Sequence, residues 1–544
     1  MEKTLCEMFA GVGGFRCGLN NINKISDVKK LEKWKTVWFN QWEPADKKIQ
    51  WAHDCYVNHF GTTLDLDGNN TTCLDINKVD KSKVPDFNLL VGGFPCQDYS
   101  VASTLASSKG LEGKKGILWW DIRDMIEAKQ PAFVLLENVD RLLKSPAKQR
   151  GRDFGIILAC FRDLGYSVEW RVINAAEYGY QQRRRRTFIF AAKVDTNFCE
   201  KAFNMHIYDV IQKEGFFAKA FPIETFDEKK IKSTTLPEGI GELSSSFKFD
   251  FENSGYMFGG DTYTTTTIPK SSRKQITLGD ILEKGTVANE FFIAENRLYY
   301  TDHSIEHSDE TINELSKEAK HTWQYIKGAK KIWRKSVNGH EYVYSEGPIP
   351  MIDANDKPAR TMLTSEGSFN RSTHIVKDKK TGKIRLLTPI EMERIQGFPD
   401  NWTKECLVGD ELVEMPLNKR RFMMGNALVV DLIKQMEPVL SDIFDDENWT
   451  FNKNDAEEPP FLILNDHTEI TYSDVKKNRH GMDYVTVHFK TPMANKIASM
   501  DINTDDNILR HVKGYSADKV IEMIGQYNKI KELCLEFAIE DSKN

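Results

Sequence analysis

The chain contains no CxxC pair among its nine cysteines, so neither a disulfide framework nor a structural zinc site is expected. It has no apolar run near the ~18 residues that a membrane-spanning helix needs. The first residues, MEKTLCEMFAG, lack the basic segment and apolar core of a signal peptide. We therefore expect a cytoplasmic protein with no metal site and no membrane partner. Its 544 residues suffice for two to four domains of roughly 150 residues each.

An excess of positive charge is also missing, since the net charge is −6, and this alone speaks against a nucleic-acid partner. The charge is unevenly spread, however. Residues 321–335 (HTWQYIKGAKKIWRK) hold five basic side chains and no acid, whereas residues 442–458 hold seven acids and one lysine. Tryptophan and tyrosine among lysines are typical of a nucleic-acid surface, and a solvated helix anchored by tryptophan is the alternative. The first interpretation predicts contacts from Lys327, Lys330, Lys331 and Arg334.

A glycine-rich turn follows the first predicted strand, residues 3–9, and continues into a helix as AGVGGFR. Strand, glycine turn and helix together open the cofactor crevice of a Rossmann-like sheet. Glycines let a ligand approach the backbone, and the amino end of the helix offers free N–H groups. The spacing is GxGG and not GxGxxG, so the dinucleotide fingerprint is missing, and an ordinary turn is the alternative.

The second predicted strand, residues 34–40, ends at Gln41, Trp42 and Glu43. Such folds place the residue that meets a ribose, and the ring that stacks on adenine, at this strand end. At the next edge, Asp75 is positioned to accept a hydrogen bond from an adenine amino group. Trp42 as a core residue and Asp75 as a turn or helix cap are equally open.

Cys96 follows a third predicted strand, residues 84–91, and the turn Gly92-Gly93. A cysteine at the carboxyl end of a strand, on a turn fixed by proline, is where an α/β fold places a nucleophile. A half-buried structural cysteine is the alternative. The small and polar residues 97–116 that follow are predicted to form a lid or, alternatively, an ordinary surface loop.

A carboxylate stands in the same position on a later strand, because residues 132–136 lead directly into Glu137. Since the carboxyl ends of parallel strands line one rim, we expect Cys96 and Glu137 to meet over one ligand. Strands are also expected at 166–173 and 187–193, with YGYQQRRRR between them. Alternation places Gln182, Arg184 and Arg186 on one face, toward the rim, with the other arginines toward solvent or phosphate.

The remaining chain divides into shorter pieces. Residues 385–400 predict a helix that starts at Thr388-Pro389 and ends at Gly397. Residues 418–436 predict another helix, entered through Gly425-Asn426. An acidic linker is expected at 441–460. A small folded appendage follows at 461–544, with a strand at 484–489 and a helix from 516 onward.

The motifs FAGVGGF, GFPCQ, ENV, QxRxR and a late GN, in this order, resemble those of the DNA cytosine-5 methyltransferases. The resemblance covers roughly 1–195 and 357–436. It implies an α/β fold in which residues 1–195 plus 415–440 form a Rossmann-like domain that binds S-adenosylmethionine. It also implies a smaller target-recognition domain at 196–414, followed by the linker and a C-terminal α+β appendage.

The resemblance further implies how the site works. A Cys96 thiolate adds to carbon 6 of cytosine, and Glu137 donates a proton toward ring nitrogen 3. Arg184 and Arg186 hold the base and favour the thiolate. Because carbons 5 and 6 are shielded inside a duplex, the target base is rotated out of the stack.

Two sets of contacts come with this resemblance. Expected cofactor contacts are Phe9, Ala10, Gly11, Gly13, Gly14, Gln41, Trp42, Asp75, Ile76, Pro95, Leu118, Asn426 and Ala427. Expected DNA contacts are Gln97, Ser100, Asn138 and Gln182. The family usually has glutamate at position 41, binding the ribose hydroxyls, so either Gln41 or a shifted Glu43 meets the ribose. Gln181 stands where the family commonly has proline.

The expected partners are double-stranded DNA, bound by a monomer, and a restriction endonuclease of a bacterial or phage restriction–modification system. A tRNA cytosine-5 methyltransferase is the first alternative, although the long 196–356 segment suits a duplex groove better. A non-catalytic DNA-binding regulator with a decayed pocket is the second. A NAD-linked oxidoreductase is the third, disfavoured by the GxGG spacing.

Overall fold

The computed structural model describes residues 1–44, 49–94, 118–237, 239–299, 317–335 and 339–447, and the backbones of strands between 462 and 513. A nine-stranded sheet forms the centre of this described part, in the order β2-β1-β3-β4-β6-β5-β8-β9-β7. The first four strands of this order are parallel, and every later pairing is antiparallel. The mixed sheet confirms the predicted α/β class.

The strand bounds are β1 Thr4–Met8, β2 Lys35–Asn40, β3 Leu89–Gly93, β4 Phe133–Val139, β5 Tyr166–Asn174, β6 Arg185–Lys193, β7 Lys232–Thr235, β8 Ser254–Phe258 and β9 Asp261–Thr265. β3 starts five residues later than predicted and continues through both glycines of the expected turn. β3 and β4 are buried on both faces, which explains their continuous apolar runs.

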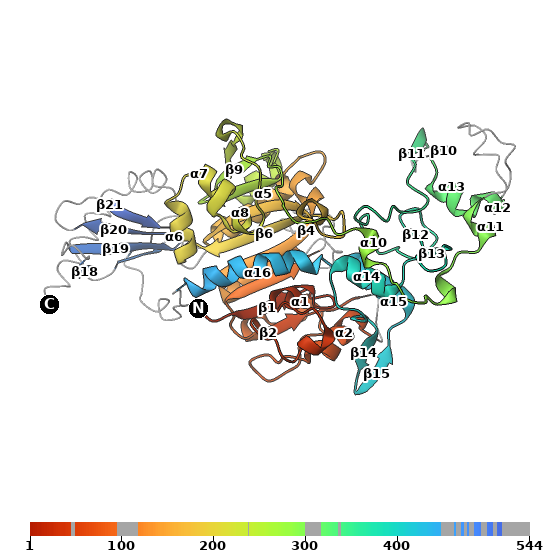
Figure 1. Ribbon diagram of the computed structural model, residues 1–544. Coiled ribbons are helices and arrows are strands. Elements are labelled where there is room, and N and C mark those ends of the chain that lie inside the picture. Colours follow the sequence, from red (N-terminus) through yellow and green to blue (C-terminus); the bar gives the residue numbers. More distant parts are fainter. Residues whose placement is uncertain are drawn as a thin grey trace.

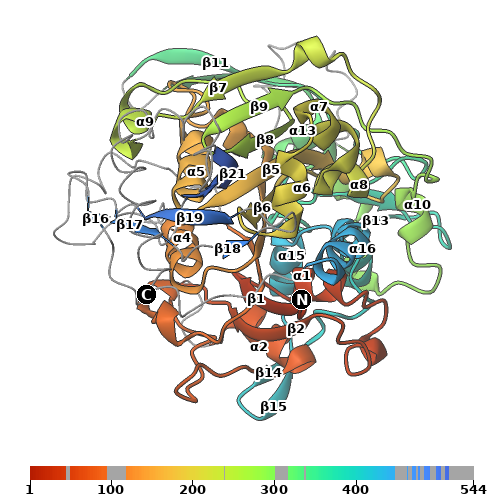
Figure 2. The same ribbon diagram turned by 90° about the vertical axis from the view of Figure 1, so that its left-hand side faces the viewer.

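Helices cover both faces of the sheet, as Figure 2 shows. α4 (Leu118–Lys129) and α5 (Arg152–Asp163) lie on one face, and their apolar residues share a core cluster with β3, β4 and β5. α1 (Gly14–Leu19), α6 (Asn197–Phe203), α8 (Phe216–Ala220) and α16 (Val430–Asp445) lie on the other. Thus α16, from the far end of the described chain, packs on α1 beside the glycine turn.

The sheet continues past residue 196, where the target-recognition domain was expected to begin. β8 pairs with β5 from Val168↔Met257 to Arg171↔Ser254, and β9 and β7 follow it. An unpaired β5 edge would leave a row of backbone donors and acceptors exposed, and β8 satisfies them. Residues 232–265 therefore belong to the same sheet as the first domain.

The second lobe lies beside the sheet in Figure 1 and holds shorter elements. Its helices are α10 Leu278–Ile281, α11 Glu295–Leu298, α12 Lys317–Lys320, α13 Trp323–Lys327, α14 Pro389–Gln396 and α15 Leu417–Asn426. Its strands form three hairpins: β10 Lys330–Lys335 with β11 Glu341–Glu346, β12 Ile375–Lys377 with β13 Ile384–Leu386, and β14 Glu405–Val408 with β15 Glu411–Glu414.

Sequence signals at α14 were sufficient to predict its two ends. Thr388 accepts the backbone N–H of Glu391, Pro389 occupies the first turn, and Gly397 ends the helix at φ 80°. The single helix predicted at 418–436 is wrong, because the backbone at Ala427 is extended and separates α15 from α16. α16 runs to Asp445, so the first residues of the expected linker are helical.

Strands of the C-terminal segment form a separate antiparallel sheet, ordered β16-β17-β19-β20-β21, with β18 paired to β19. Their bounds are β16 Leu462–Ile463, β17 Glu469–Tyr472, β18 Lys476–Lys477, β19 Asp483–Lys490, β20 Ala498–Asn503 and β21 Leu509–Lys513. β19 confirms the strand predicted at 484–489. The helix predicted from 516 onward lies outside the described residues.

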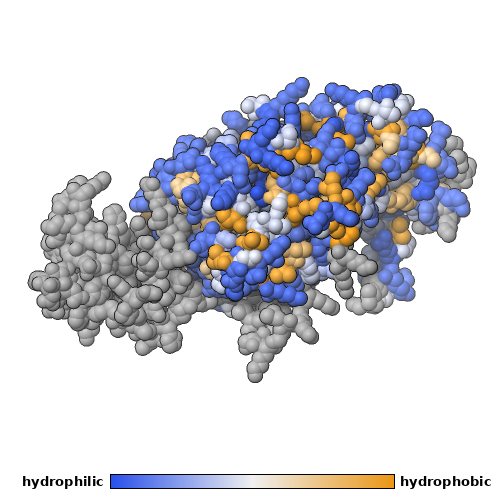
Figure 3. All heavy atoms as spheres, turned by 90° about the horizontal axis from the view of Figure 1, so that it is seen from below, coloured by the Kyte–Doolittle hydropathy of each residue, from blue (hydrophilic) through white to orange (hydrophobic). Residues whose placement is uncertain are grey.

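The face seen from below in Figure 3 carries small groups of hydrophobic side chains separated by hydrophilic ones. Among the described helices, none is long and apolar enough to cross a membrane.

The contact of α1 with α16 can be tested at Gly18. A Cβ at this position would lie 2.5 Å from the Cβ of Ile433 and 3.1 Å from the carbonyl oxygen of Val430. We expect Gly18→Ala to lower the free energy of unfolding by about 1–3 kcal/mol, because the added methyl group overpacks this seam. Urea denaturation followed by circular dichroism measures the change.

Gly241 is the matched control, since it lies in α9 (Ile240–Ser246) and no described atom lies within 4 Å of a Cβ there. Gly241→Ala should leave stability unchanged or raise it by up to about 1 kcal/mol through helix propensity. Equal effects of the two substitutions would contradict a tight α1–α16 seam.

Candidate active site

The glycine turn after β1 takes a left-handed course that explains its composition. Phe9, Gly11 and Gly13 have φ values of 54°, 56° and 86°. A Cβ on Gly13 would lie 2.7 Å from the ring of Phe60, so this position has room for glycine only. At Gly11, by contrast, no described atom lies within 4 Å of where a Cβ would be. Within the described part of the chain, the turn therefore leaves space above Gly11.

Gln41 ties the end of β2 to this turn. The backbone N–H of Gly11 donates to Oε1 of Gln41 at 2.8 Å, and the backbone N–H of Gln41 donates to the carbonyl of Thr72 at 2.9 Å. Gln41 is buried, while the next residue, Trp42, is 37% exposed. Trp42 is therefore not a core residue, and its ring is available to a ligand.

The other expected cofactor contacts differ in their exposure and partners. Asp75 accepts the backbone N–H of Asn77 and caps a short 3₁₀ turn, as its alternative interpretation predicted. Ala10, Gly14 and Ile76 are buried, Leu118 and Ala427 are half-buried, and Asn426 is exposed at the end of α15. A Cβ on Gly14 would meet the side chain of Leu428, which brings the residues after α15 against the glycine turn.

Trp402 holds the glycine turn from behind, and the sequence analysis did not single it out. Its indole N–H donates to the carbonyl oxygen of Val12 at 2.8 Å, and the side chain is fully buried. The ring stacks on His59 with centroids 3.7 Å apart and also contacts Phe398. A tryptophan in GFPDNW carries no signal for a partner about 390 positions earlier.

A carboxylate beneath the turn was also missed. Glu7 lies on β1 and accepts a hydrogen bond from the Tyr56 hydroxyl at 3.1 Å. Arg16 donates in turn to that hydroxyl at 3.4 Å. Burial raises the pKa of Glu7 to about 7. The only sequence signal was an acidic residue inside an otherwise apolar strand.

Glu137 and Arg186 meet at the carboxyl ends of the parallel strands. β3 pairs with β4 so that Gly93 lies opposite Glu137, and a Cβ on Gly93 would lie 3.3 Å from Oε2 of Glu137. Arg186 pairs with Val139 across β4 and β6, and its Nε lies 2.7 Å from Oε1 of Glu137. The two carboxyl oxygens of Glu137 thus have different neighbours. Oε1 contacts Arg186, and Oε2 faces the backbone of Gly93.

Asn138 positions the chain that leaves β3. Its side-chain amide donates to the carbonyl of Phe94 at 3.0 Å, and the residue is 1% exposed. The expected DNA contact at Asn138 is therefore corrected to a buried structural one. The predicted residues Pro95, Cys96, Gln97 and Ser100, and the predicted lid, lie outside the described residues.

Arg184 and Gln182 do not share a face with Arg186, because β6 begins only at Arg185. Arg184 donates to the carbonyls of Met362 and Gly425, at 2.9 and 3.2 Å. Gln182 is fully buried and donates to the carbonyl of Ile395 at 3.2 Å. The predictions that Gln182 contacts DNA and that Arg184 points to the rim are corrected, since both hold the second lobe.

The buried position of Arg184 also changes the pKa of its guanidinium group. Its burial, and after it the positive charge of Arg186, lower the pKa of the Arg184 guanidinium to about 9. Nε of Arg184 is buried and has no hydrogen-bond partner among the described residues.

The basic segment 321–335 is only partly a surface. Lys327 is 1% exposed and donates to the carbonyl of Thr373, and Lys330 is buried beside Glu346. Burial lowers the pKa of Lys327 to about 8. The predicted DNA contacts at these two lysines are therefore wrong, while Lys331 and Arg334 are exposed on β10.

Comparisons with known proteins agree with the motif order. The family model described as C-5 cytosine-specific DNA methylase matches residues 4–441. The type II methyltransferase M.Sau3AI of Staphylococcus aureus is 44% identical over 434 residues, which cover 79% of this chain and 93% of that protein. The type II methyltransferase M.NlaIV of Neisseria lactamica is 25% identical over 378 residues, covering 66% and 84%.

Among solved structures, the methyltransferase EhMeth of Entamoeba histolytica superposes with a TM-score of 0.43 at 13% identity, covering 82% of this chain and 99% of that one. The family assignment rests on the sequence comparisons, since the family model matches most of the chain and M.Sau3AI is similar over nearly its whole length. This protein belongs to the C-5 cytosine-specific DNA methylase family and is a DNA cytosine-5 methyltransferase.

Proposed function

We propose that the protein methylates carbon 5 of a cytosine that is rotated out of duplex DNA, with Cys96 as nucleophile and Glu137 as acid. The observation that carries this proposal is the strand register that sets Glu137 opposite Gly93 and beside Arg186. Cys96 follows Gly93 by three positions in the sequence. A thiolate and a carboxyl that flank one pyrimidine are what covalent activation of the ring requires.

The glycine turn fits S-adenosylmethionine as the cofactor. The open space above Gly11 and the exposed ring of Trp42 lie at the ends of neighbouring strands β1 and β2. Bound there, S-adenosylmethionine supplies the electrophilic methyl group. Phe9, Gly11 and Trp42 would hold it, with Asn426 and Ala427 closing the pocket from the end of α15.

Gln41 would meet this cofactor differently from the glutamate that the family usually carries. Its Oε1 already accepts the N–H of Gly11, which leaves the Nε2 group as a hydrogen-bond donor. A donor can bond one ribose oxygen but lacks the charge of a carboxylate. Glu43 is the alternative ribose ligand, and its backbone is fixed by two hydrogen bonds with Gln50.

In the reaction, the Cys96 thiolate would form a bond to carbon 6 of cytosine and push electron density toward ring nitrogen 3. Glu137 would donate a proton there through Oε2, since Arg186 occupies Oε1. Arg186 would thus orient the acid. Once carbon 5 carries the methyl group taken from S-adenosylmethionine, a water molecule would accept the carbon 5 proton and Glu137 would take back the proton on ring nitrogen 3. The carbon 6–sulfur bond would then break and release the Cys96 thiolate. Arg184 would act as a positioning residue that joins the two lobes.

The proposed biological setting is a type II restriction–modification system, because M.Sau3AI and M.NlaIV are named type II methyltransferases. Double-stranded DNA is then the substrate, and the partner is an endonuclease that cuts the same sequence. The protein would act on DNA as a monomer.

Trapping on duplex DNA with 5-fluorocytosine at the target position tests the nucleophile. Fluorine at carbon 5 prevents the last elimination, so the covalent complex should persist in denaturing electrophoresis when S-adenosylmethionine is present. We expect Cys96→Ala to abolish the complex and Glu137→Gln to slow its formation at least tenfold, through loss of the acid.

Cys73 provides a matched control, because it is a half-buried cysteine in a turn outside the strands. Cys73→Ala should trap as well as the unchanged protein. A covalent complex that survives Cys96→Ala would refute the assigned nucleophile. Trapping on tRNA but not on duplex DNA would favour the RNA-modifying alternative.

The hydrogen bond from Trp402 to Val12 tests the cofactor turn. Trp402→Phe keeps an aromatic ring but leaves the buried Val12 carbonyl without its donor. We expect the dissociation constant for S-adenosylmethionine to rise about tenfold, or ~1.4 kcal/mol, by isothermal titration calorimetry. Phe398→Leu changes the packing on the same ring without removing a hydrogen bond. A rise no larger than that of the Phe398 variant would contradict the role of Trp402.

A further inference from the structure

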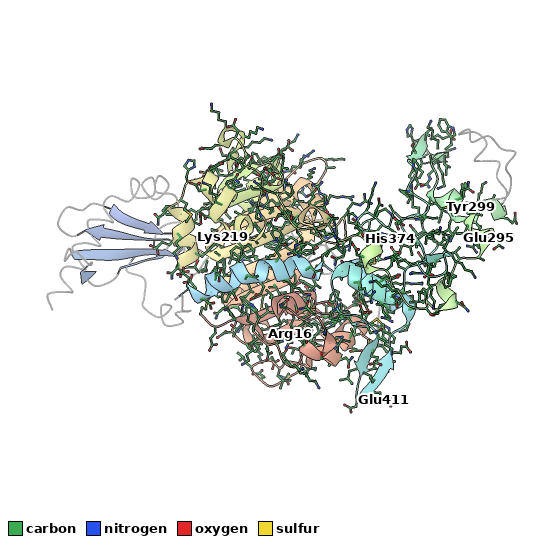
Figure 4. All side chains as sticks on the ribbon, in the orientation of Figure 1. Arg16, Lys219, Glu295, Tyr299, His374 and Glu411 are labelled. Atoms are coloured by element: carbon green, nitrogen blue, oxygen red, sulfur yellow. The ribbon has the colours of Figure 1, made fainter. Side chains whose placement is uncertain are left out.

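Two hairpins project from the second lobe with opposite charge. Residues 330–346, which contain β10 and β11, carry four lysines or arginines and two glutamates. Residues 405–414, which contain β14 and β15, carry four acids and no basic residue. The two hairpins point in opposite directions in Figure 1, and Glu411 marks the outer end of the acidic one in Figure 4.

The basic hairpin has an inner and an outer face, set by its antiparallel register. Lys330↔Glu346 and Ile332↔Tyr344 lie on the inner face, and Lys331↔Ser345 and Trp333↔Val343 lie on the outer face. Trp333 is 70% exposed, more than any other large hydrophobic side chain of the described residues. Val343, directly opposite, is 44% exposed.

The inner face fixes the hairpin to the lobe. Lys330 donates to the carbonyl of Ile326 at 2.9 Å, and Arg371 forms an ion pair of 2.8 Å with Glu346. The guanidinium of Arg334 lies 3.7 Å from the ring centroid of Tyr344. Glu346 is thus neutralised from the inner side, and the strands are held in one register.

The charges of the outer face suit a polyanion. Lys331 and Lys335 flank Trp333 at alternate positions, so the three side chains lie in one row. The one acid on the outer face of the described strands, Glu341, pairs with Lys335 at 3.4 Å, and both are largely exposed. An exposed ion pair of this kind is weak, so Lys335 can exchange Glu341 for a phosphate at little cost.

We propose that the outer face of the β10–β11 hairpin binds duplex DNA beside the target cytosine, with Trp333 packed against sugars or bases. Lys331 and Lys335 contact phosphates on either side of it. A large apolar ring between two cations matches a nucleic-acid backbone, whose charged phosphates alternate with apolar sugar and base surfaces. The inference rests on the proposed DNA substrate and identifies the β10–β11 hairpin as an element that binds it.

The test compares the two hairpins in the full-length protein. Fluorescence anisotropy with a labelled duplex of about 30 base pairs measures the dissociation constant. We expect Trp333→Ala to weaken binding about tenfold, within the range known for loss of one aromatic contact to nucleic acid. Leu412→Ala is the matched control, because Leu412 is 57% exposed on the acidic hairpin. It should leave DNA affinity unchanged.

Salt dependence provides the second measurement. Replacing both Lys331 and Lys335 by alanine should reduce the slope of log K against log salt by roughly two, since each phosphate contact contributes about 0.9. Unchanged affinity in Trp333→Ala together with an unchanged slope would overturn the proposal, and would leave a protein partner as the occupant of this face.

The test of the hairpin and the test of the catalytic proposal can fail independently of each other. Failure of the unchanged protein to trap 5-fluorocytosine DNA, with a tenfold loss of DNA affinity in Trp333→Ala, would refute the assigned chemistry and retain the hairpin. Normal trapping at saturating DNA, with no affinity difference between the Trp333 and Leu412 variants, would refute the hairpin and retain the chemistry.

Discussion

The parallel register of β3 against β4 is the constraint on which the site depends. It sets Gly93 opposite Glu137, so the carboxyl group lies over the one residue type that has no Cβ to crowd Oε2. The next antiparallel pairing, β4 with β6, brings Arg186 to the other oxygen. A shift of one residue in either pairing would turn these side chains to the opposite face of the sheet.

Buried donors that end on backbone carbonyls join the two lobes. Arg184 reaches Met362 and Gly425, Gln182 reaches Ile395, and Trp402 reaches Val12. Because these donors and acceptors are removed from water, losing one partner leaves the other unsatisfied, which costs more than the net worth of the bond. The second lobe therefore fixes the backbone that carries the glycine turn and the start of β6.

The sequence predicted the strands and helix ends that depend on neighbouring residues. It did not predict side-chain directions that depend on partners far along the chain. Continuous apolar runs marked β4 and β6, and the cap residues of α14 were correct, because burial and capping leave signals in adjacent positions. Strand ends and alternation also predicted that Glu137 and Arg186 face one rim, although their ion pair was not predicted. The direction of the Arg184 side chain was predicted wrongly, because the alternation of strand β6 was extended to residues that precede the strand. Lys327 was taken for a surface cation because its acceptor, the carbonyl of Thr373, lies 46 positions away.

The seam between α1 and α16 has a consequence for how the protein is made. Residues 14–19 can complete their packing only after residues 430–445 have left the ribosome, so the core beside the first strand is closed late in synthesis. Closing so long a loop is slow, and the unfinished face stays exposed during synthesis. A chaperone that shields nascent chains would therefore matter more for this protein than for one whose neighbouring helices are consecutive.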